Sequence, residues 1–132
     1  GGTTGHPSNG RTPYLVENTI NIDTFNPASG DVIQALDIPA ETLIMQAGIE
    51  VITALSSSVT MDLGITGGDV DNFVDGDGNG TGYSVLTATA NLVVASADTL
   101  DILTGGAQST VGKVRVWAVL CDVSGIDETD HN

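Results

Sequence analysis

The side chains best suited to chemistry are the carboxylates of one loop rich in glycine and aspartate. Asp75, Asp77, Asn79 and Gly80 match the first half of a calcium-binding loop, in which short oxygen ligands alternate ahead of a glycine turn. The second half fails, because the twelfth position from Asp75 is Leu86, where that loop needs a bidentate glutamate. With no flanking helix expected either, an EF-hand is excluded.

A looser calcium site stays open in the same loop. Clustered carboxylates repel one another unless a cation offsets their charge, so calcium is the one cofactor that the sequence suggests. The candidate ligands are Asp69, Asp71, Asp75, Asp77 and Asn79. The alternative is a solvated loop in which aspartate and glycine serve turn geometry alone.

The sequence shows no grouping of nucleophile, base and acid. His6 and His131 lie in polar terminal segments, where no fixed hydrogen-bond geometry is expected. Cys121 has no structured histidine nearby in sequence to activate it, so a buried structural thiol is the expected role. A pair of carboxylates cannot be singled out among 17 acidic residues without their separation. We therefore predict no enzymatic activity and no catalytic residues.

The closing strand carries the strongest candidate for a protein interface. Lys113, Arg115 and Trp117 alternate with apolar residues, so they share one face of a strand while the apolar residues share the other. Those apolar residues are Val114, Val116, Ala118 and Leu120. Tryptophan and arginine are frequent at interface hot spots, and a basic stripe here suits the acidic loop of a neighbouring copy. The alternative places Trp117 in the core of a second sheet, with Lys113 and Arg115 exposed.

The charge of the chain limits its partners. Seventeen acidic residues against three basic ones give a formal charge of −14, which repels nucleic acid and anionic membranes. No run of about 18 apolar residues is present, and the first residues lack the basic and then apolar pattern of a signal peptide. The sequence therefore predicts a protein that contacts neither nucleic acid nor membrane.

The elements that must position these residues are strands. Period-two alternation indicates a strand from Tyr14 through Ile22, and another after the turn FNPASGD. Further strands are expected at residues 43–52, with a bulge or bend at Gly48, and at 59–65, 83–88, 91–95, 99–104 and 111–123. Residues 67–82 read as a loop anchored by Phe73 and Val74.

This pattern predicts one all-β domain. About eight antiparallel strands with regular turn signals indicate a single β-sandwich of jelly-roll type. We place the sandwich at residues 14–125, after an extended N-terminal arm at 1–13 and before a polar C-terminal tail at 126–132.

Three segments carry a resemblance to a known class of proteins. They are YLVENTINIDTFNPASGDVIQALDIPAETLIMQAGIEVITA, the loop FVDGDGNG and the closing KVRVWAVLCDVSG. Together they resemble small virion structural proteins of tailed phages, especially phages of marine bacteria, over about residues 12–125. In such proteins a DIPA turn, a long apolar strand and an aspartate-rich loop precede a strand with a tryptophan, here Trp117.

The resemblance implies a capsid decoration, cement or head-fibre protein that binds the outer surface of a phage head and stabilises it. Its partners would then be the major capsid protein and further copies of itself, with a trimer favoured. Besides the Trp117 strand, Arg11 and Pro13 of the arm are candidate subunit contacts. The alternative is a fibre or tail module for host-surface glycans, in which the acidic loop holds calcium and Phe73 or Tyr83 stacks on sugar.

Overall fold

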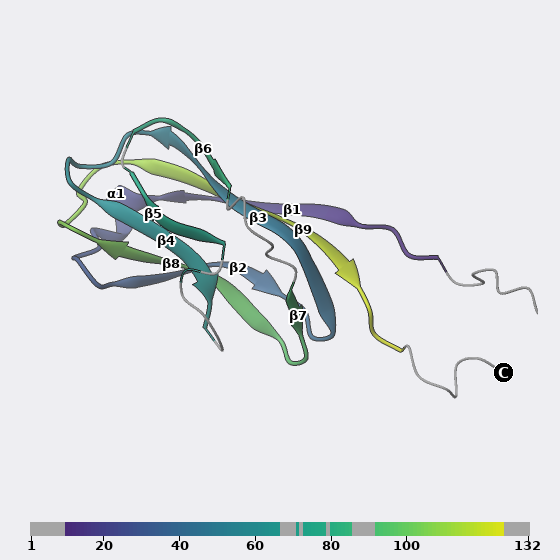
Figure 1. Cartoon of the computed structure of the whole chain (residues 1–132). Helices are drawn as coiled ribbons and strands as arrows, with labels where there is room; N and C mark the ends of the chain where they lie inside the picture. Colours follow the sequence, from purple (N-terminus) through teal and green to yellow (C-terminus); the bar gives the residue numbers. More distant parts are fainter. Residues whose placement is uncertain (1–9, 67–70, 72, 79, 86–91, 126–132) are drawn as a thin grey trace, which may run out of the picture.

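The computed structural model describes residues 10–66, 71, 73–78, 80–85 and 92–125 (Figure 1). These contain nine strands and one short helix. In chain order they are β1 (Tyr14–Asn21), α1 (Ile22–Phe25), β2 (Val32–Ile38), β3 (Thr42–Thr53), β4 (Thr60–Ile65), β5 (Val74–Asp77), β6 (Gly82–Val85), β7 (Leu92–Val94), β8 (Asp98–Gly105) and β9 (Lys113–Asp122). The predicted loop after β4 thus contributes a strand of its own, β5, which was not expected.

The strands pair as in one long hairpin, with the first strand of the chain against the last. β1 pairs with β9, β2 with β8, β3 with β6 and β4 with β5, all antiparallel, so the partners are nested in chain order. These pairs are divided between two sheets. Sheet A has the order β1-β9-β3-β6, with β7 also paired to β3, and sheet B has the order β2-β8-β4-β5. This is the arrangement of a jelly roll, so the predicted all-β sandwich is confirmed.

The two sheets lie face to face and share one hydrophobic core (Figure 1). β9 contributes the most regular part of it, because every second residue from Val114 to Leu120 is fully buried. Met61, Leu63 and Leu100 of sheet B are equally inaccessible. Each of the buried valine, leucine and methionine side chains stabilises the fold by about 1.5–3 kcal/mol.

The long strand β3 corrects one detail of the prediction. The expected bulge at Gly48 is wrong, since Gly48 pairs regularly with Trp117. The register instead shifts between Ile44 and Gln46 and again between Val51 and Thr53. The first shift changes the buried set from even to odd positions, and the extra residues, Met45 and Ile52, are exposed.

The connection from β1 to β2 differs from the expected continuous strand. Ile22 leaves the sheet and begins α1, whose four residues were not predicted. Its N–H donates to the carbonyl oxygen of Gly112 at 2.9 Å, and its side chain is fully buried. The turn that follows is confirmed, with Gly30 at φ 92° and a hydrogen bond from Asp31 N–H to Ala28 O of 3.0 Å.

One glycine marks a close approach between two loops of sheet B. Gly106 has φ 80°, and a Cβ atom there would collide with the carbonyl oxygen of Ser58. Ser58 itself has φ 70°, in the turn before β4. Backbone therefore packs directly on backbone at this point, and no side chain fits between.

We predict that Gly106→Ala lowers the free energy of unfolding by at least about 2 kcal/mol, because positive φ and the collision act together. The control is Gly78→Ala, where no atom lies within 4 Å of the added Cβ and a change below about 1 kcal/mol is expected. Chemical denaturation followed by circular dichroism measures both. Equal effects of the two variants would contradict the close approach.

Candidate interaction surface

The outward face of sheet A carries the residues that the sequence predicted for an interface. Lys113, Arg115 and Trp117 of β9 are half-buried and alternate with its core residues, which confirms that they share the face turned away from the core. Trp117 lies between Glu17 of β1 and Gly48 of β3. Trp117 is therefore not part of the core between the sheets.

The charge of Arg115 is balanced within its own chain. Its Nη1 lies 3.3 Å from Oε1 of Glu50 on β3, and its Nε lies 3.9 Å from Oε1 of Glu17 on β1. Glu50 Oε1 and Arg115 Nε are buried without a well-formed hydrogen bond, so the contact is ionic and loosely aligned. The expected basic stripe is thus flanked by carboxylates of its own sheet, which sequence reasoning had not indicated.

Apolar side chains cover the rest of this face toward the end where β1 begins and β9 ends. Leu15 is 60% exposed and Val93 is 55% exposed. The register places Leu15 beside Val119, and Leu43 between Cys121 and Val93. Cys121 is half-buried here, outside the core that the sequence suggested for it.

We call this surface the sheet A face. It comprises Leu15, Glu17 and Thr19 of β1, Leu43, Gln46 and Glu50 of β3, Val93 of β7, and Lys113, Arg115, Trp117, Val119 and Cys121 of β9. The sequence suggested only those residues of the face that lie on β9. The other residues come from strands that are far away in sequence and pair with β9 only in the folded chain.

The described part of the N-terminal arm lies beside the end of β9. Arg11 Nη1 donates to the Asp122 carbonyl oxygen at 3.1 Å and lies 3.5 Å from its carboxylate. Hydrogen bonds from Ser124, aided by the charge of Arg11, lower the pKa of Asp122 below its usual value. Pro13 is exposed just before β1. The structure thus ties Arg11 to its own chain, and the subunit contacts expected of Arg11 and Pro13 stay a prediction.

The acidic loop is only partly described. Asp69 and Asn79 lie outside the described residues, Asp71 is half-buried, and Asp75 is exposed on β5, the strand that also contains Asp77. Oδ1 of Asp62 accepts a hydrogen bond from Gly76 N–H at 2.6 Å, which ties the loop to β4. No group of three possible metal ligands occurs among the described residues. The calcium site stays a prediction.

Phe73 contradicts part of the glycan hypothesis. It is fully buried, and its N–H donates to Leu63 O at 2.9 Å, so its ring cannot stack on a sugar. The sequence had also named it as an anchor of the loop, and that role fits. The Tyr83 side chain is not described, and His6 and His131 lie outside the described residues.

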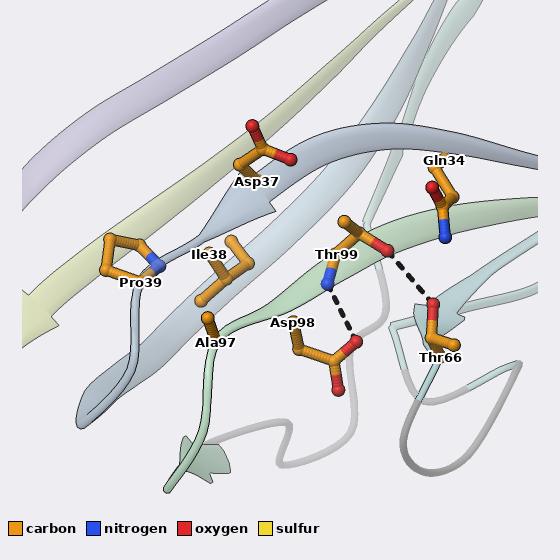
Figure 2. Close-up of a pocket in the computed structure, with 8 residues that line it drawn as sticks. All are labelled: Gln34, Asp37, Ile38, Pro39, Thr66, Ala97, Asp98 and Thr99. Carbon is orange, nitrogen blue, oxygen red and sulfur yellow. Dashed lines mark hydrogen bonds between the residues drawn. The ribbon is translucent and has the colours of Figure 1, made fainter.

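A shallow pocket of about 550 Å³ lies where β2 ends and β8 begins. Its lining residues are Gln34, Asp37, Ile38, Pro39, Thr66, Ala97, Asp98 and Thr99. Figure 2 shows the Thr66 and Thr99 hydroxyls facing each other, 2.9 Å apart, and Asp98 turned back to accept the Thr99 N–H at 2.7 Å. The two hydroxyls are therefore in contact, and each has one proton to donate.

A buried carboxylate anchors this arrangement. Asp101 is only 8% exposed, between Gln34 and Gly64 on the outer side of sheet B. Its carboxylate accepts hydrogen bonds from the hydroxyls of Thr66 and of Thr99, the latter at 2.6 Å. The two donors offset the cost of removing the carboxylate from water, so the cluster has a structural role.

No helix in the described part of the chain is long and apolar enough to cross a membrane. No family model matches the sequence, and no curated protein matches it.

Two solved structures are similar. One is a chain in the capsid of Ralstonia phage GP4, with a TM-score of 0.71 and 14% identity, over 93% of this chain and 92% of that one. The other is a chain in the acidic stable capsid structure of Helicobacter pylori bacteriophage KHP30, with a TM-score of 0.63 and 11% identity, over 83% and 86%. The chain shares its fold with chains of two phage capsids. At this identity the likeness concerns the fold alone.

We predict that Phe73→Ala lowers the free energy of unfolding by about 3–5 kcal/mol, as truncation of a fully buried aromatic does. Thermal and urea denaturation measure the loss. Phe25→Ala is the control, because Phe25 is 56% exposed and its truncation should cost less than about 1 kcal/mol. A stable Phe73→Ala protein would contradict the anchoring role.

We also predict that Thr99→Val costs about 1–3 kcal/mol, since the buried Asp101 carboxylate loses a donor while the side-chain shape is kept. The same change at Thr19, exposed on β1, should alter stability by less than about 0.5 kcal/mol. The midpoints of urea unfolding of the two variants measure the difference in stability. A neutral Thr99→Val would mean that water replaces the hydroxyl.

Proposed function

We propose that the chain is a virion structural protein, a decoration or cement subunit that binds the outer surface of a phage head and stabilises it. The observation that carries the proposal is the fold shared with a phage capsid chain over 93% of this chain and 92% of that one. The match is nearly complete on both sides, so the two chains are of similar size and the likeness is not to one module of a larger protein.

The charge of the chain supports an outward position. A subunit on the inner surface of a head would face densely packed phosphate, which a formal charge of −14 repels. On the outside, the same charge faces solvent and any basic groups of the shell. The major capsid protein is accordingly the proposed partner.

A structural role also agrees with the chemistry of the described residues. The Sγ of Cys121 is half-buried and lies 3.9 Å from the carbonyl oxygen of Asp122, and the buried carboxylate of Asp101 accepts hydrogen bonds from two hydroxyl groups. Stabilisation of a shell needs only many weak contacts, because symmetry repeats each contact over all copies and the total becomes large.

The test is to mix the purified full chain with empty heads of the source phage, with and without calcium, and to pellet the heads. We expect saturable binding and a rise in the temperature at which the heads open, because ligation stabilises the assembled state. Deletion of residues 1–13 should weaken binding if the arm makes contacts.

The control is the same assay with bovine serum albumin as an unrelated acidic protein. A chain that does not bind heads under either condition contradicts the proposal. Binding that needs calcium would assign the acidic loop a role in it.

A further inference from the structure

We infer that the sheet A face is a self-association surface, on which two copies of this chain pack through a two-fold axis. The inference goes beyond the proposed function and does not depend on it, because the occupant is the chain itself and not the capsid.

The first step is the charge of this face. Glu17 and Glu50 are its acidic residues, and Arg115 and Lys113 are its basic ones, so its formal charge sums to zero. The remaining carboxylates, 15 of 17, lie elsewhere in the chain. Two copies of charge −14 repel each other wherever carboxylates meet, and the sheet A face avoids that.

The second step is the apolar area on the same face. Trp117 lies at its centre, with Leu15 and Val119 on one row and Leu43, Val93 and Cys121 at the end of the sheet. Exposed and half-buried apolar side chains gathered on one face, with an aromatic residue and an arginine among them, are typical of an interface centre.

The third step decides the occupant. A basic partner would be drawn to the acidic remainder of the chain and not to a face of zero charge. The outer side of sheet B cannot complement this face, because carboxylates lie close to its exposed apolar residue, Val32. Val32 and Asp62 both pair with Leu103, and Asp101 lies two residues from Leu103 on the same side of β8. Phe25, Ile52 and Val111, three further exposed apolar residues, lie at the opposite end of β9, whereas Tyr14 begins β1 and Met45 lies at the first bulge of β3, both close to this face. An apolar face therefore finds its best match in itself, which gives an isologous contact.

Trp117 is the only tryptophan of the chain and reports directly on this face. The experiment measures its emission and the molar mass by light scattering from about 1 µM to about 1 mM, the range of weak to moderate association. We expect the mass to rise from one chain to two while the emission moves to shorter wavelength. Higher salt should strengthen the dimer by screening the −14 charges.

Leu15→Glu is the diagnostic variant and Val32→Glu its matched control. Both residues are more than half exposed, at 60% and 54%, and both changes add one negative charge, but they lie on opposite sheets. We expect Leu15→Glu to raise the dissociation constant at least about tenfold and Val32→Glu to leave it nearly unchanged. Val93→Glu serves if Leu15→Glu fails to fold.

Three results would overturn the inference. A monomer with constant emission at all concentrations excludes self-association through this face. Equal weakening by Leu15→Glu and Val32→Glu would mean that general repulsion, and not this face, governs association. A trimer, the state that the resemblance favours, would exclude the two-fold contact, and a shift in emission only when empty heads are added would give the face another occupant. Failure of head binding alone would leave the inference intact.

Discussion

The structure depends on the alternation of side chains along β9. This strand lies between β1 and β3 in sheet A, so both of its edges are paired. One of its faces is turned toward the core and the other away from it. Val114, Val116 and Leu120 on one face are fully buried against sheet B. A shift of the register by one residue would place Arg115 and Trp117 in the core and the valines in water, so the burial of these side chains fixes the register strongly. The same alternation determines which residues form the outward face.

Strands that alternate without interruption could be predicted from the sequence. β4 and β9 were expected almost as they are, because a half-buried strand shows its period directly in the residue types. β3 was also expected as a long strand, but its inner and outer positions were not, because the bulges at Met45 and Ile52 exchange them and apolar residues occur on both sides of each bulge. The sequence likewise gave no reason to expect β5, because glycine and aspartate are typical of turns. Its pairing depends on the burial of Phe73 and Val74 against β4, a tertiary effect.

Only the part of the sheet A face that lies on β9 could be predicted from the sequence. The position of Arg115 and Trp117 on one side of this strand follows from local alternation alone. The neighbours of that row come from segments far away in sequence, and no local pattern indicates that Glu17 and Glu50 would lie on either side of Arg115. That pairing changes the interpretation of the surface, because a basic stripe would attract an acidic partner, whereas two basic residues offset by two glutamates do not. The fold therefore converts an expected site of charge attraction into a site of low charge.

The placement of the few basic residues explains why this conversion matters. Three cations cannot neutralise 17 carboxylates, so they can lower repulsion over only one part of the surface. All three lie along β9: Lys113 at its start, Arg115 within it, and Arg11 against Asp122 at its end. If they were spread over the molecule, no surface large enough for a protein contact would be close to neutral. Because they gather along β9, the sheet A face is left with low charge and can approach another protein, while the carboxylates elsewhere keep the rest of the molecule solvated.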